Sequence, residues 1–98
     1  MRDGTRLMTV VYVPKFGDPS AKRPVLLERT PYSAGPYGPA TQKRHRNRFL
    51  QDAGYVFAYQ DVRGKYLSEG TFENVRPILP RGAKGVDEAT DTYDTVDW

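Results

Sequence analysis

The chain has 98 residues, no cysteine, and 15 Lys and Arg against 12 Asp and Glu, which gives a formal charge of +3. The lack of cysteine excludes disulfide bonds, zinc sites with thiolate ligands and a thiol nucleophile. The longest unbroken apolar run, Tyr55–Tyr59, is too short to cross a bilayer, which needs about 20 residues. Met1 is followed by Arg2-Asp3-Gly4 rather than by an apolar stretch, so we expect no signal peptide in this chain and leave its localisation open.

Charge is distributed unevenly along the chain. Residues 1–49 hold ten Lys and Arg against three Asp and Glu, whereas residues 50–98 hold five against nine. The basic excess peaks at Lys43–Arg48, and such a run raises the hypothesis of a small module that binds nucleic acid. The acidic half would repel nucleic acid, however, and no aromatic residue interleaves the basic run. We therefore expect neither a nucleic acid nor a membrane as partner.

Two strands are predicted in the first third of the chain. Arg6–Val13 is rich in β-branched residues, partly alternates between apolar and polar positions, and is stopped by Pro14. Lys15–Pro24 contains Gly, Asp, Pro and Ser and is typical of a turn region. Val25–Thr30 is a second short strand that ends before Pro31.

The middle of the chain is predicted to hold a loop and then a helix. Tyr32–Pro39 is rich in Gly and Pro and must be a loop. Thr41–Ala53 contains neither residue and predicts a helix that is capped by Thr41 and stopped by Gly54. Three residues of this helix are expected to face inward: Phe49, Leu50 and Ala53.

A buried strand and a second helix complete the pattern. Tyr55–Gln60 is apolar nearly throughout, which favours a strand covered on both faces in a parallel sheet. A long Gly- and Pro-rich stretch, Val62–Val86, separates it from a helix predicted over Asp87–Trp98. In that helix Ala89, Tyr93 and Val96 recur at helical spacing among acidic residues. The order indicates an α/β fold with a parallel sheet, and three strands do not complete such a domain, so we expect part of a larger protein.

No catalytic constellation stands out from residue types alone. The single histidine, His45, lies inside the basic run, and neither Gly-x-Ser-x-Gly nor a phosphate-binding glycine loop is present. Ser33 and Ser68 lack the strand–Ser–helix setting that exposes a nucleophile. The acidic residues of the last helix are more typical of a solvated face near a helix N-terminus than of a metal site: Asp87, Glu88, Asp91, Asp94 and Asp97. We therefore expect neither metal nor cofactor.

Four stretches, in order, carry a resemblance to a known family. They are Met1–Leu7, Leu27–Tyr32, Gly54–Gly70 and Asp91–Trp98, and the third is the most specific because a buried strand runs into Asp-x-Arg-Gly-x-x-x-Ser-Glu-Gly. Together they span nearly the whole chain. The sequence resembles the opening of the α/β-hydrolase family of X-Pro dipeptidyl peptidases, cocaine esterase and α-amino-acid ester hydrolases, the CocE/NonD-type hydrolases.

This resemblance implies that residues 1–98 are the N-terminal part of an α/β-hydrolase core. It implies an early antiparallel strand over 5–13, parallel strands over 25–30 and 55–60, and a helix over 87–98. The nucleophile elbow, the cap and the C-terminal β domain of the family would lie outside this chain, as would the Ser-His-Asp triad. The implied function is a serine hydrolase for small-molecule ester, amide or peptide substrates. The chain alone is expected to be inactive. The alternative is a truncated product without a function of its own. The oligomeric state stays open.

Three residues are the candidate site residues. In the family, the Tyr of the Arg-x-Pro-Tyr stretch donates its hydroxyl to the oxyanion, which implies this role for Tyr32; packing of the phenol at a strand end is the alternative. The preceding Pro31 stiffens the turn, and a stiff donor stabilises developing charge without reorganising. Asp61 and Arg63 are expected to be structural residues near the site, through an ion pair or backbone hydrogen bonds that brace Gly64–Gly70.

Overall fold

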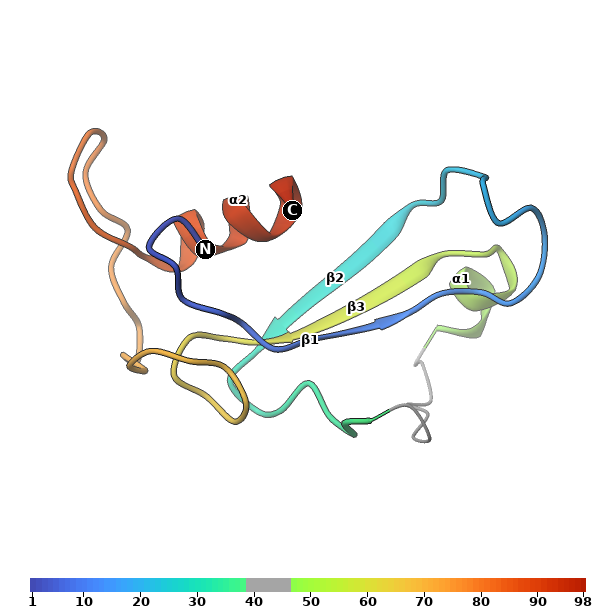
Figure 1. Ribbon diagram of the computed structural model, residues 1–98, viewed down its shortest axis with the longest axis horizontal. Helices are drawn as coiled ribbons and strands as arrows, with labels where there is room; N and C mark the ends of the chain where they lie inside the picture. The colour runs from blue at the N-terminus through green and yellow to red at the C-terminus, as the bar shows by residue number, and fades with distance from the viewer. Residues whose placement is uncertain (39–46) are drawn as a thin grey trace.

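A computed structural model of the protein describes residues 1–38 and 47–98, and Figure 1 shows its elements along the chain. In chain order these are β1 (Thr9–Tyr12), β2 (Val25–Thr30), α1 (Arg48–Asp52), β3 (Val56–Asp61) and α2 (Glu88–Asp97). The two helices lie at opposite ends of the sheet (Figure 1). Neither of these helices is long and apolar enough to span a membrane.

The three strands form one mixed sheet in the order β1-β3-β2. β1 is antiparallel to β3, with Thr9 opposite Gln60. β2 is parallel to β3, and their register ends with Thr30 opposite Asp61. The structure therefore confirms the expected α/β class, with one early antiparallel strand and a parallel pair. β1 is shorter than the predicted strand because only Thr9–Tyr12 pair with β3, opposite Phe57–Gln60.

The core is built around β3, the central strand. Every β3 residue from Phe57 to Asp61 is buried, which confirms the prediction of a strand covered on both faces. Phe57 and Tyr59 form the core cluster with Ala34 of the loop after β2. Four partly buried side chains pack against this cluster: Tyr12, Tyr37, Leu50 and Tyr55. The Tyr12 and Tyr59 rings meet edge to face, with centroids 6.0 Å apart.

Helix α1 is shorter than the predicted helix over Thr41–Ala53. Asn47 is extended at φ −111° and caps the helix by accepting a hydrogen bond from the Leu50 N–H at 3.1 Å, so α1 begins at Arg48. The predicted cap Thr41, His45 and most of the basic run lie outside the described residues. The end was predicted correctly, because Gly54 follows in the left-handed region at φ +82°.

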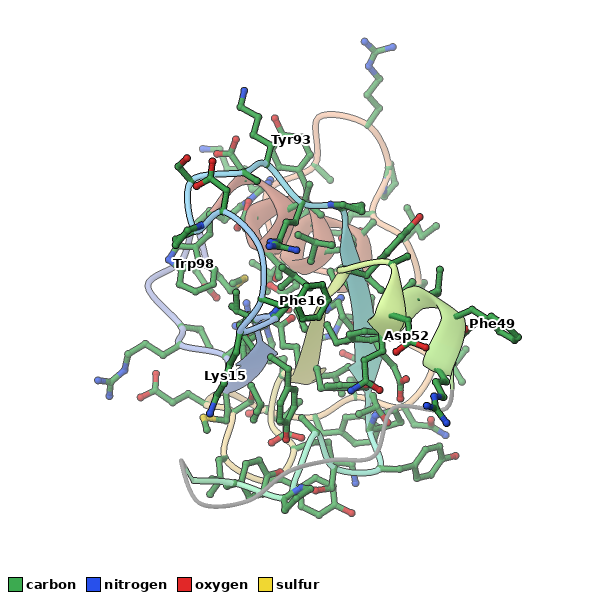
Figure 2. The ribbon with its side chains drawn as sticks, turned by 90° about the vertical axis from the view of Figure 1, so that its right-hand side faces the viewer. Lys15, Phe16, Phe49, Asp52, Tyr93 and Trp98 are labelled. Carbon is green, nitrogen blue, oxygen red and sulfur yellow. The ribbon has the colours of Figure 1, made fainter. Side chains whose placement is uncertain are left out.

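The predicted inward face of this helix is wrong at two of its three positions. Leu50 packs against the core cluster, but Phe49 is 87% exposed and Ala53 is exposed as well. Figure 2 shows Phe49 pointing away from the sheet. The physical reason is length, since a helix of five residues makes less than two turns and presents about one residue to the sheet.

Helix α2 begins as predicted and packs differently from the prediction. Asp87 accepts a hydrogen bond from the Thr90 N–H at 2.7 Å, and the Thr90 hydroxyl accepts one from the Asp87 N–H at 2.9 Å, which completes a capping box. The acids were expected to be solvated, yet Asp91 is only 1% exposed. Tyr93 and Val96 are instead exposed. The helix therefore packs on the sheet through its polar side.

The turn after β3 depends on a glycine. Gly64 has φ +70° and donates its N–H to the Glu69 carbonyl at 2.8 Å. A Cβ at this position would lie 2.0 Å from the backbone nitrogen of Phe72 and 2.5 Å from the carbonyl carbon of Thr71. Backbone atoms cannot give way as a flexible side chain can, so only glycine fits here.

We expect Gly64→Ala to destabilise the protein much more than Gly82→Ala. Gly82 has a similar φ of +84° but no atom near its would-be Cβ, so its substitution costs only the left-handed strain, about 1–2 kcal/mol. Gly64→Ala adds the backbone clash to the same strain. Urea unfolding of both variants measures the difference, and equal losses would contradict the close approach.

Candidate functional site

The candidate site lies at the carboxyl edge of the parallel pair β2 and β3. Thr30 and Asp61 are the last residues of these strands and are register partners. In open α/β sheets, ligands bind outside the carboxyl ends of parallel strands. The loop that leaves β2 here carries Tyr32, and the loop that leaves β3 carries Arg63.

Tyr32 presents its phenol to solvent. The residue is 84% exposed, and its backbone N–H donates to the Thr30 hydroxyl oxygen at 3.0 Å. Pro31, between these two residues, fixes its own φ and restricts the residue before it. The backbone of Tyr32 is thus fixed while its hydroxyl is accessible to a ligand at the strand end.

Asp61 is fully buried, and its carboxylate accepts three hydrogen bonds. Oδ1 accepts from the Ala34 N–H at 2.6 Å, and Oδ2 accepts from the Tyr37 hydroxyl at 2.7 Å and from the Leu67 N–H at 3.3 Å. The Asp61 carbonyl also accepts the Ser68 hydroxyl at 2.7 Å. Asp61 therefore ties the loop after β2 and the loop after β3 to the same strand end.

Tyr37 is a partner of Asp61 that reasoning from the sequence did not predict. Burial raises the pKa of its phenol, and the hydrogen bond to Asp61 raises it further, whereas the hydrogen bond with Ser33 lowers it. The net pKa is above the ordinary value, so this hydroxyl keeps its proton at neutral pH and remains a donor. A Tyr five residues after Tyr32 in a Gly- and Pro-rich loop carries no sequence signal for this contact.

Arg63 forms ion pairs with the buried Asp91 and the exposed Asp3 rather than a pair with Asp61. The residue is 5% exposed; its Nε and Nη2 contact Asp91 at 2.9 and 2.6 Å, and its Nη1 contacts Asp3 and the Thr5 hydroxyl, both at 2.7 Å. The hydrogen bonds with Asp91 raise the pKa of the guanidinium, and those with Arg63 lower the pKa of Asp3. Arg63 thereby joins the end of β3 to α2 and to the N-terminal turn.

A second polar cluster holds the same helix against the sheet. The Arg29 guanidinium donates to Gln60 Oε1 at 2.8 Å, to the Glu88 carbonyl at 2.9 Å and to the Thr92 hydroxyl at 2.5 Å. Arg29 also pairs with the Glu88 carboxylate at 3.0 Å, and Thr95 donates to Gln60 at 3.1 Å. Sequence reasoning missed this face, although Glu88, Asp91, Thr92 and Thr95 recur at steps of three and four.

The described residues at this edge do not form a cluster of metal ligands. Among residues 1–38 and 47–98, no group of three or more His, Asp or Glu side chains is placed to hold a metal ion. The acids of α2 are used otherwise, since Asp91 pairs with Arg63, and Asp94 with Arg2 at 2.7 Å.

Comparison with known proteins decides the family. Residues 3–98 match the family of X-Pro dipeptidyl-peptidase (S15 family). The chain belongs to this family. The α/β-hydrolase resemblance predicted from four sequence stretches is thereby confirmed, and the matched residues include the carboxyl edge with Tyr32, Asp61 and Arg63.

Relatives of the S15 chain include esterases and a peptidase. It is 37% identical over 99 residues to the cocaine esterase of Rhodococcus sp. (strain MB1 Bresler), covering all of this chain and 15% of the relative. Among solved structures it is similar to an α-amino acid ester hydrolase, with a TM-score of 0.79 and 39% identity. It is also similar to an aminopeptidase from a marine sediment Thaumarchaeota archaeon, with a TM-score of 0.74 and 36% identity. In both cases the match covers all of this chain and 17% of the other protein's chain.

We expect Arg63→Met to destabilise the protein by about 3–5 kcal/mol, because it leaves the buried Asp91 carboxylate without its partner. Arg6→Met is the matched control, since Arg6 pairs with Glu69 at the exposed surface and such pairs contribute about 0–1 kcal/mol. Denaturant unfolding of both variants gives the comparison. A loss for Arg63→Met no larger than that for Arg6→Met would contradict the role of the Arg63 ion pairs.

Acid should weaken the same ion pairs through Asp3. Because its folded pKa lies below the ordinary 3.8, Asp3 stabilises the protein above that pH and loses its contribution as the pH falls toward the folded value. We expect Asp3→Asn to be less stable than the parent at pH 7 and the gap to narrow at about pH 2.5. Asp52→Asn, at an exposed pair with Arg48, is the control and should differ little at either pH. Urea unfolding at the two pH values is the measurement, and a gap that widens in acid would contradict the assignment.

Proposed function

We propose that residues 1–98 are the N-terminal segment of a serine hydrolase for small ester, amide or peptide substrates, and that Tyr32 supplies a hydroxyl to its oxyanion hole. The observation that carries the proposal is an exposed phenol on a fixed backbone at the carboxyl edge of the parallel strands. The family and the names of the relatives, two esterases and an aminopeptidase, support the reaction class.

In this mechanism the chain contributes a donor rather than the nucleophile. A serine elsewhere in the intact enzyme attacks the carbonyl carbon, with a histidine taking its proton, and negative charge develops on the carbonyl oxygen. The Tyr32 O–H donates to that oxygen as the charge forms. Because the Tyr32 backbone is already held by Thr30 and Pro31, little reorganisation is needed when the tetrahedral intermediate forms.

The serines of this chain serve structural contacts, which supports a nucleophile outside it. The Ser68 hydroxyl donates to the Asp61 carbonyl at 2.7 Å and accepts the Met8 N–H at 2.8 Å. The Ser33 hydroxyl lies 3.0 Å from that of Tyr37, and Ser20 bonds to Asp18 at 2.7 Å. The chain also spans only 15–17% of the length of the relatives it matches, so a triad in the rest of a longer protein is consistent with this proposal.

The test of the oxyanion role is Tyr32→Phe in the intact hydrolase that contains this segment. We expect kcat for 4-nitrophenyl acetate to fall by about 10²–10³-fold with little change in KM, because the lost hydrogen bond forms in the transition state. Tyr93→Phe, which removes an exposed phenol from α2, is the matched control and should leave kcat unchanged. An unchanged kcat in Tyr32→Phe would overturn the oxyanion role.

The location of the nucleophile has its own test. The coding sequence that follows Trp98 should contain Gly-x-Ser-Tyr-x-Gly within about 30 residues, and a fluorophosphonate probe should label the intact protein at that serine. Labelling of the isolated 98-residue chain would show instead that the nucleophile lies within it.

A further inference from the structure

The buried carboxylate of Asp61 faces the loop that carries Tyr32 rather than solvent. It takes one hydrogen bond from the backbone of that loop, at Ala34, and one from a side chain of the loop, at Tyr37. A charge in a fully buried position is costly unless donors surround it, and here most of its donors come from this single loop. The carboxylate and the conformation of the loop therefore depend on each other.

The direction of the protons can be assigned along this loop. A carboxylate only accepts, so Tyr37 gives its single hydroxyl proton to Asp61. In the 3.0 Å contact between Ser33 and Tyr37 the donor must then be Ser33. The Ser33 oxygen in turn accepts the Gly35 N–H at 3.1 Å. The result is one directed chain of hydrogen bonds in which each polarises the next, and it ends on Asp61.

This series of hydrogen bonds supports a strained residue directly beside Tyr32. Ser33 has φ +84°, which residues other than glycine rarely adopt and which persists only when the surroundings hold it. The hydroxyl of Ser33 is held by Tyr37, and the next residue, Ala34, is held by Asp61. Because the Tyr32 ring is exposed, the position of its Cβ and the rotamers it can adopt depend on this backbone rather than on packing of the ring.

We infer that Asp61 and Tyr37 are positioning residues that aim the Tyr32 hydroxyl at the oxyanion. The inference rests on the proposed oxyanion role of Tyr32. Asp61 then has a function beyond bracing the loop after β3. Tyr37 acts on the reaction only through the loop, because its own hydroxyl is turned inward to Asp61.

A double-mutant cycle in the intact hydrolase tests this inference, with 4-nitrophenyl acetate as substrate. Tyr37→Phe removes one hydroxyl and keeps the ring in the core, and we expect kcat to fall about 10- to 100-fold with KM nearly unchanged. In the Tyr32→Phe background, Tyr37→Phe should cost less than about twofold more, because a positioning residue has nothing left to aim. Ser33→Ala breaks the same chain without touching Asp61 and should act in the same direction as Tyr37→Phe, so the test does not depend on a single variant.

The control is Tyr55→Phe, the same change at another tyrosine that packs against the core cluster, and it should leave kcat unchanged. Losses of Tyr37→Phe and Tyr32→Phe that multiply in the double mutant would overturn the positioning role. So would wild-type kcat in both Tyr37→Phe and Ser33→Ala. Wild-type kcat in Tyr32→Phe would instead overturn the oxyanion role itself, so the two failures are distinguishable.

Discussion

The guanidinium of Arg63 is the interaction on which the arrangement of this chain depends. It lies just beyond the end of β3 and reaches the carboxylates of Asp91 and Asp3, which come from segments 28 and 60 residues away in the sequence. The pair of Arg63 and Asp91 is buried, and two opposite charges in such a position are costly when apart and are stable only in good geometry. The planar guanidinium supplies that geometry with several fixed donors. It thereby fixes where α2 and the N-terminal turn lie with respect to the sheet.

Asp61 and Arg63, the two charged residues at this end of β3, have different partners. Arg63 holds α2, whereas Asp61 holds the loop after β2 that carries Tyr32. A charged pair two residues apart in sequence suggests mutual neutralisation, yet each finds partners that are distant along the chain. The candidate site is thus framed by polar contacts from a central strand, while Ala34 and Tyr37 of the same loop also pack on the apolar core around Phe57 and Tyr59.

The sequence was informative where local rules decide the structure. Apolar runs between Pro and Gly predicted the parallel pair β2 and β3, and Asp87 with the acids after it predicted the start of α2. It was uninformative where distant partners decide. The face of α2 that packs on the sheet is decided by its contacts with Arg29 and Arg63. Both residues lie outside 87–98, so the pattern of the helix alone does not reveal these contacts. The candidate Tyr32 came from a family resemblance, whereas its link to Asp61 through the loop emerged only from the folded geometry.

The polar attachment of α2 has a thermal consequence. Release of a helix that packs through apolar side chains raises the heat capacity, and the resulting stability wanes on cooling. Release of α2 instead hydrates Asp91, Arg63, Arg29 and the Thr hydroxyls, and hydration of polar surface lowers the heat capacity. The free energy of attaching this helix therefore curves less with temperature than that of packing the aromatic core.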